Sequence, residues 1–197
     1  MTAAARMFPA PDTDAAIIER SVREPECFAA VFDRYYSQIH GYIARRLGRS
    51  LADDLASETF LTAFASRDRY DLAHPDARPW LYGITSNLIA RHHRAEQRRY
   101  RAMARTGTDE TSEGHADEVV GRLDAVARRG SLAAALSEIS DGDRDVLLLV
   151  AWAELTSEEA GRALGIPAGT ARSRLHRARQ RIRAALDRTD DRDHTRG

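Results

Sequence analysis

The pattern of hydrophobic and polar positions predicts a helix near the start of the chain. Between residues 28 and 43, apolar side chains recur every three or four positions, which is the repeat of one face of an α-helix. Gly48 follows this stretch, and glycine is common just beyond a helix end. Residues 1–22 contain prolines and small residues without such a repeat, and we expect a flexible tail there. The apolar positions of the predicted helix are Phe28, Val31, Phe32, Tyr35, Ile39, Tyr42 and Ile43.

Two more helices are predicted in the first half of the chain. One covers residues 51–64, and the other starts near Trp80 and runs into a basic end. The segment between them, residues 66–79, is predicted to form a loop, because Pro75 and Pro79 interrupt any helix.

A polar segment then divides the chain. Thr, Ser, Gly, Asp and Glu are frequent in residues 106–130, which we predict to be a flexible linker. Helical periodicity returns at Ser131, and helices are predicted over residues 131–139 and 146–152, the second with Asp141 as N-cap. No segment has a pattern typical of strands. The predicted fold is therefore all-α, with two small helical domains joined by the linker.

The last part of the chain predicts a helix-turn-helix. Thr156 and Glu159 have the spacing of a capping box, and the helix that they begin is expected to end at Gly165. A final helix is expected from Thr170 to about Asp187. Such a motif places its second helix in the DNA major groove. One stripe of the final helix is apolar and consists of Ala171, Leu175, Ala178 and Ile182.

Charge is segregated along the chain, although the 30 basic residues, all of them Arg, balance the 30 acidic residues. Arg clusters in residues 91–105 and 172–183, while acidic residues dominate 109–124. Between residues 172 and 188, seven Arg stand against the single acid Asp187, so ion pairs within the helix cannot neutralise this face. DNA binding is the favoured interpretation, and a solvated Arg-rich hairpin is the alternative.

The polar face of the final helix supplies the expected DNA contacts. Side chains opposite the apolar stripe, in the first two turns, are expected to contact base edges. Arg174 and Arg181 lie on a flank and are expected to contact phosphates. His176 is equally compatible with a plain surface position. The full set of expected contacts is Thr170, Arg172, Ser173, Arg174, His176, Arg177 and Arg181.

Three segments together resemble a known family. Residues 169–179 (GTARSRLHRAR) are similar to the −35 recognition helix of extracytoplasmic-function sigma factors, in the sigma-70 family. Residues 53–60 (DDLASETF) resemble the segment that grips RNA polymerase, and residues 79–88 (PWLYGITSNL) the segment leading into the −10 reading helix. The resemblance implies a region 2-like domain over 23–105 and a region 4-like domain over 131–187. A charged tail, residues 188–197, is expected to follow.

The same resemblance implies an alternative sigma factor that recruits core polymerase to −35 and −10 elements and assists DNA opening. Its expected partners are the β′ clamp helices and β subunit of polymerase, promoter DNA and an anti-sigma factor. The expected polymerase contacts are Asp53, Asp54, Ser57 and Glu58, which include an acidic helix face. The expected −10 contacts are Tyr70, Asn87, Arg91, Arg94 and Arg98.

Two positions depart from the family pattern. Ser57 stands where an amide side chain is usual, and Gly161 stands inside a helix where glycine costs about 0.5–1 kcal/mol relative to alanine. The runner-up interpretation is a helix-turn-helix regulator that acts without polymerase. It would explain residues 131–187 but leave residues 53–60 and 79–88 without a purpose.

The sequence gives no reason to expect an enzyme, a cofactor or a metal site. Asp53 and Asp54 have no nucleophile or phosphate-binding loop around them, and the adjacent His92 and His93 do not share a helix face. Cys27 is the single cysteine, which excludes a disulfide within the chain. No apolar run is long enough to span a membrane or to form the core of a signal peptide, so we expect a cytoplasmic protein.

Overall fold

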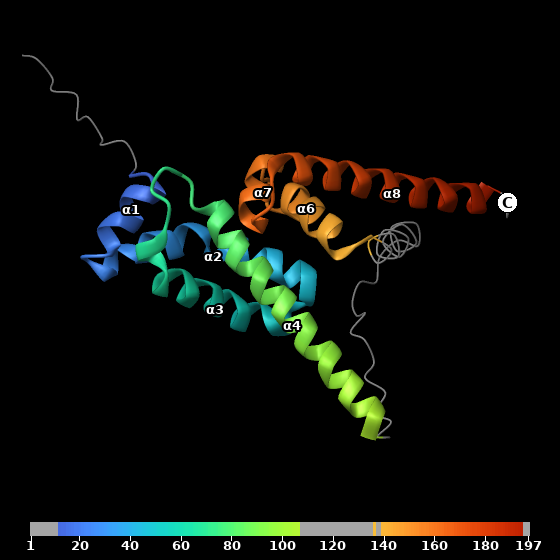
Figure 1. Ribbon diagram of the computed structural model, residues 1–197, viewed down its shortest axis with the longest axis horizontal. Coiled ribbons are helices and arrows are strands. Elements are labelled where there is room, and N and C mark those ends of the chain that lie inside the picture. The colour runs from blue at the N-terminus through green and yellow to red at the C-terminus, as the bar shows by residue number, and fades with distance from the viewer. Residues whose placement is uncertain (1–11, 107–135, 137–138, 195–197) are drawn as a thin grey trace, which may run out of the picture. The chain divides into compact units, whose positions relative to one another are not determined.

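The computed structural model describes residues 12–106, 136 and 139–194, and every regular element in them is a helix. This confirms the predicted all-α class (Figure 1). The chain forms two compact units, one ending at Thr85 and the other beginning at Ser86. Most of the predicted linker and of the predicted helix over residues 131–139 lies outside the described residues.

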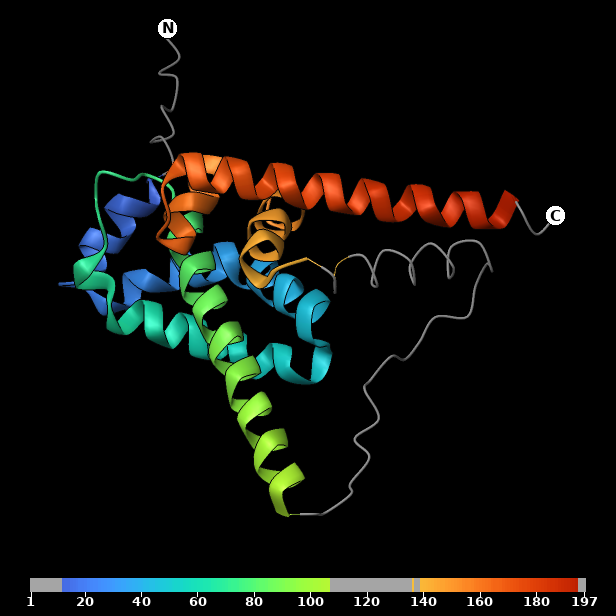
Figure 2. The same ribbon diagram turned by 45° about the vertical axis from the view of Figure 1, so that its right-hand side comes forward.

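The N-terminal unit contains three α-helices and the beginning of a fourth. These are α1 (Asp14–Ser21), α2 (Ala29–Leu47), α3 (Ala52–Ala65) and α4 (Arg78–Thr106). Short 3-10 turns connect them: η1 (Pro25–Phe28), η2 (Arg49–Leu51) and η3 (Arg67–Arg69). Helices α2 and α3 pack side by side (Figures 1 and 2).

The core of this unit follows the predicted apolar faces. On α2 the stripe is buried from Val31 to Ile43, except that Phe32 stays 40% exposed. Leu55 and Phe60 of α3 are buried. The ring of Tyr82 on α4 meets that of Tyr42 on α2 edge to face, with centroids 5.2 Å apart. Aromatic pairs of this geometry add to the stabilisation that burial provides.

Within the expected flexible tail, residues 1–11 lie outside the described residues, and helix α1 corrects the prediction for residues 13–22. Thr13 caps it by accepting a hydrogen bond of 3.3 Å from the amide of Ala16. Ile17 and Ile18 are buried. An eight-residue helix is marginal by itself, so its stability depends on these tertiary contacts. Its apolar positions span too few residues for the sequence pattern to distinguish a helix from a loop.

Two helix boundaries also differ from expectation. Helix α4 begins at Arg78, with Pro79 in its first turn, where proline is tolerated because that amide has no partner within the helix. The final helix, α8 (Ala168–His194), continues past Asp187 into the segment predicted as a charged tail. No glycine or proline stands between residues 170 and 194 to stop it.

The C-terminal unit also contains α6 (Asp141–Trp152) and α7 (Ser157–Leu164), and both pack on α8 (Figure 2). Both bonds of the predicted capping box are present at the start of α7, and Gly165 ends this helix with φ 63°. At the start of α6, Ser140 takes the place expected for Asp141: its side chain accepts from the amide of Asp143. The buried residues of this unit include Val146, Leu149, Leu155, Ala171, Leu175 and Ala178.

Candidate functional site

Helix α8 presents the predicted polar face outward. Its apolar stripe is buried at Ala171, Leu175 and Ala178, and half-buried at Ile182. On the opposite side the residues expected to read bases are exposed: Arg172, Ser173, His176 and Arg177. Among the remaining expected contacts, Thr170 and Arg174 are half-buried and Arg181 is exposed. Burial of one face therefore orients the other toward solvent, as groove binding requires.

Arg177 has a partner that sequence reasoning missed. Its Nη2 lies 2.9 Å from Oδ1 of Asp143, and its Nε donates to Oδ2 at 3.3 Å. The Asp143 side chain is only 6% exposed, whereas that of Arg177 is 50% exposed. The hydrogen bond from the guanidinium lowers the pKa of the Asp143 carboxyl, because it favours the charged form. The two residues are 34 positions apart, and no local sequence pattern indicates that they meet.

Two further arginines lie near the start of α6. The guanidinium of Arg174 passes so close to Gly142 that a Cβ there would come within 2.7 Å of its Nη1. Glycine thus leaves room for this side chain. The positive charge of Arg181 also lowers the pKa of the Asp143 carboxyl, but by less than Arg177 does. Three arginines of α8 therefore lie near the first turn of α6, which carries the buried carboxylate of Asp143.

An acidic face on α3 contains all four expected polymerase contacts. Asp53, Asp54 and Ser57 are exposed and Glu58 is half-buried. Asp53 also pairs with His40 of α2, whose Nε2 is 3.0 Å from its Oδ1. The face continues into an apolar residue that the sequence analysis did not single out. Leu61 follows Ser57 by four positions and is 69% exposed.

The loop before α4 holds Tyr70 in a buried position, 8% exposed. Its hydroxyl donates a 2.6 Å hydrogen bond to the carbonyl of His74, and its ring centroid lies 4.9 Å from that of the half-buried Trp80. In this conformation the Tyr70 ring packs inside the protein. It would stack on a base only after this loop moves away.

The other expected −10 contacts form an exposed stripe on α4. Asn87, Arg91, Arg94 and Arg98 are spaced by four, three and four residues, so they share one helix face. All four are exposed. Three positive charges along one face suit a phosphate backbone.

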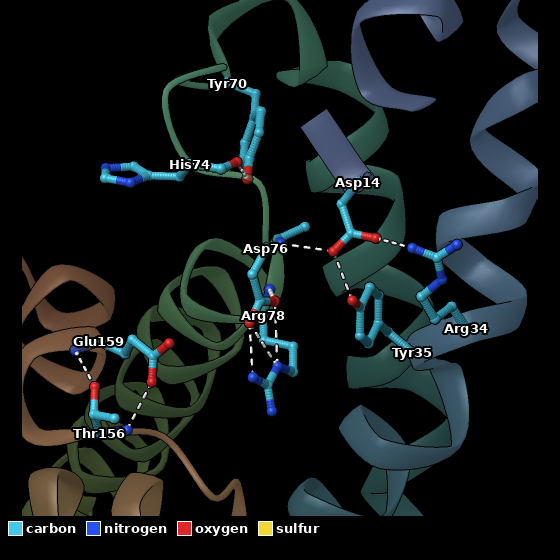
Figure 3. A network of polar contacts seen from close by, with 10 residues as sticks. Asp14, Arg34, Tyr35, Tyr70, His74, Asp76, Arg78, Thr156 and Glu159 are labelled. Atoms are coloured by element: carbon cyan, nitrogen blue, oxygen red, sulfur yellow. Dashed lines mark hydrogen bonds and ion pairs between the residues drawn. The ribbon is translucent and has the colours of Figure 1, made fainter. Parts of the chain in front are cut away.

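A buried carboxylate anchors the loop that precedes α4 (Figure 3). Asp14 pairs with Arg34, accepts a 2.6 Å hydrogen bond from the Tyr35 hydroxyl and accepts a 2.8 Å bond from the amide of Ala77. Its own amide donates to the carbonyl of Pro75. Burial raises the pKa of Tyr35, and the Asp14 carboxylate raises it further. Asp14 therefore ties α1 to α2 and to the loop.

Two other features, a metal cluster and a membrane-spanning helix, are absent from the part of the chain that the structure describes. There, no three His, Cys, Asp or Glu side chains gather in a way that could hold a metal ion. Nor is any helix within 12–106 or 139–194 long and apolar enough to cross a membrane.

Comparison with known proteins identifies two regions of the chain. Residues 31–99 match the family described as Sigma-70 region 2, and residues 129–182 match Sigma-70, region 4. The chain is 30% identical over 171 residues to ECF RNA polymerase sigma factor SigW of Bacillus subtilis (strain 168), covering 83% of this chain and 90% of SigW. It is 33% identical over 165 residues to RNA polymerase sigma factor CarQ of Myxococcus xanthus, covering 82% and 90%.

A solved structure shares the fold. It is the sigma factor RpoE in complex with the anti-sigma factor NepR from Bartonella quintana. The match has a TM-score of 0.62 at 22% identity and covers 81% of this chain and 96% of the other.

Proposed function

This chain belongs to the extracytoplasmic-function sigma factors of the sigma-70 family, and we propose that it brings core RNA polymerase to promoters through three surfaces. It is an alternative sigma factor that directs transcription initiation. We assign it a DNA-binding role without catalysis of its own, in the cytoplasm, where polymerase and DNA are found.

The exposed polar face of α8 is the observation that carries the proposal. Its base-reading residues are Arg172, Ser173, His176 and Arg177, which enter the major groove at the −35 element. Arginine can hold guanine O6 and N7 with two bonds, which discriminates by about 1–3 kcal/mol. Arg174 and Arg181, with Thr170 at the helix start, contact the phosphates that fix the position of the helix.

The acidic face of α3 is the proposed polymerase surface. Asp53, Asp54 and Glu58 complement a basic partner, the clamp helices of the β′ subunit. Leu61 adds an apolar contact beside them, since an exposed leucine next to charged groups is suited to burial in an interface. Opposite charges steer the encounter, and the apolar contact slows dissociation.

The stripe on α4 is the proposed −10 surface. Arg91, Arg94 and Arg98 hold the phosphate backbone, and Asn87 can donate to and accept from a base edge. Opened DNA exposes the phosphates and the base edges of a single strand. This stripe therefore holds the non-template strand while the duplex opens. An anti-sigma factor, such as the one that binds RpoE in the solved complex, would compete for surfaces of this kind.

The test is run-off transcription with purified core polymerase on a library of promoter fragments. The full-length protein should direct specific initiation from a subset of fragments and should co-purify with core polymerase. Binding to DNA without binding to core polymerase would support the polymerase-independent regulator instead.

A further inference from the structure

We propose that Asp143 is a positioning residue for −35 recognition, which holds Arg177 so that its free edge is presented to a guanine. The inference rests on the proposed reading of the −35 element by α8. Asp143 lies on α6 and would not itself contact a base. It would act by fixing the guanidinium of Arg177 before DNA arrives.

The geometry of the ion pair leaves the reading edge of Arg177 available. Asp143 engages Nε and Nη2, the two nitrogens on the side of the guanidinium, at 3.3 and 2.9 Å. Arginine has five N–H donors in a planar fork. One N–H of Nη1 and the second N–H of Nη2 point out from the end of the guanidinium, side by side. These two donors match the two acceptors of guanine, O6 and N7. The ion pair and a bidentate guanine contact can therefore exist together.

The burial of Asp143 makes it a fixed support. Its side chain is 6% exposed, and its backbone amide donates to Ser140 Oγ at the N-cap of α6. The long side chain of Arg177 is half exposed and would otherwise sample many rotamers. Holding it in one orientation beforehand reduces the entropy lost on binding and favours the base whose acceptors lie in that direction.

Lysine could not replace Arg177 in this arrangement. An ammonium group has no planar fork, so it cannot satisfy the carboxylate with one edge and a guanine with the other. Asparagine at position 143 would be nearly isosteric with Asp143, but it would lack the charge that makes these hydrogen bonds strong.

The experiment measures binding of full-length variants to duplexes with a randomised −35 element and to a scrambled duplex, at one salt concentration. Arg177→Ala should identify the guanine position that this side chain reads. Asp143→Asn should lower the preference at that same position by about fivefold, the lower end for one bidentate arginine–guanine pair. Its binding to the scrambled duplex should be unchanged or slightly tighter, because a negative charge near DNA is removed.

Three controls separate positioning from folding. Asp141→Asn changes a nearby carboxylate on the same helix that is 91% exposed and pairs with Arg144, and it should leave every preference unchanged. Asp143→Asn in an Arg177→Ala background should have no further effect on preference. If Asp143→Asn does not fold, Asp143→Glu keeps the charge but displaces the carboxylate by one methylene, and it should lower the preference at the same position while Arg177 remains in place.

The outcomes are distinguishable from those of the proposed function. If Asp143→Asn lowers thermal stability but keeps the preference at every position, the ion pair only ties α8 to α6 and the inference is wrong. If Arg177→Ala changes no preference while Arg172→Ala does, the inference again fails but reading by α8 stands. If none of the α8 variants changes any preference, the proposed reading itself is refuted.

Discussion

The hydroxyl of Tyr35 on α2 donates a hydrogen bond of 2.6 Å to the carboxylate of Asp14, the first residue of α1. Both side chains are buried, and the same carboxylate receives the amide of Ala77 at 2.8 Å. One charged group thus connects a terminal helix, a core helix and the loop that leads into α4. A buried carboxylate is stable only when such partners replace the water that it has lost.

Replacing Asp14 with alanine should destabilise the N-terminal unit by about 1.5–3 kcal/mol, the usual range for hydrogen bonds to a charged group. Urea unfolding can be followed by Trp80 fluorescence in a Trp152→Phe background, because the chain has two tryptophans. Asp12→Ala is the matched control: its pair with Arg20 is about half exposed, and exposed pairs contribute about 0–1 kcal/mol. Equal losses for both variants would show that the buried network has no special role.

Charge reversal on the acidic face of α3 should weaken binding to core polymerase. The double variant Asp54→Lys, Glu58→Lys places like charges against a basic partner, and we expect affinity to fall about tenfold or more. A pull-down of holoenzyme measures this, with circular dichroism to verify the fold. Glu19→Lys, at an exposed position of α1, should assemble normally. Normal assembly of the double variant would place the polymerase surface elsewhere.

Gly161→Ala should destabilise the C-terminal unit by about 1 kcal/mol. A Cβ at this buried position would lie 3.0 Å from the carbonyl oxygen of Ile166 and 3.5 Å from Cβ of Ala171. Overpacking of about 1–3 kcal/mol therefore outweighs the helix-propensity gain of about 0.5–1 kcal/mol. The sign is opposite to the one that propensity alone predicts.

Gly169→Ala is the matched comparison for that experiment. It lies in the first turn of α8, and a Cβ there would meet no atom within 4 Å. Only the propensity gain remains, so this variant should be more stable by about 0.5–1 kcal/mol. Trp152 fluorescence in a Trp80→Phe background reports on the unit that contains both glycines. Stabilisation by both alanines would contradict the close approach at Gly161.

The ion pair of Asp143 with Arg177 should make stability depend on pH in the acid range. Because the pKa of Asp143 is lowered in the folded protein, the pair stabilises fully above the ordinary aspartate pKa of about 3.9. The contribution is lost as pH falls through the lowered value. Asp143→Asn should therefore be less stable than the wild type at pH 5–7, and the difference should shrink below about pH 4.

Thermal unfolding at pH 3 to 7, followed by Trp152 fluorescence in the same Trp80→Phe background, measures that difference. Asp141→Asn should follow the wild type closely at every pH, since its carboxylate is almost fully exposed. A gap between Asp143→Asn and the wild type that persists unchanged to pH 3 would mean that the charge of Asp143 is not its cause.

Local patterns were enough to predict most of the helices. The apolar repeat of α2, the glycines that end α2 and α7, and the capping box of Thr156 and Glu159 each depend on residues a few positions apart. The same holds for the two faces of α8. Interactions over one or two helical turns set these features, so they can be recognised in the sequence.

Contacts between distant residues could not be predicted in this way. Tyr70 is buried, Asp14 pairs with Tyr35, and Asp143 pairs with Arg177. Each of these features depends on side chains of different elements meeting. Periodicity indicates which face of a helix is buried but not which residue it meets. Tertiary packing brings these side chains together, and the low polarity of the interior makes a buried charge or hydroxyl without a partner costly.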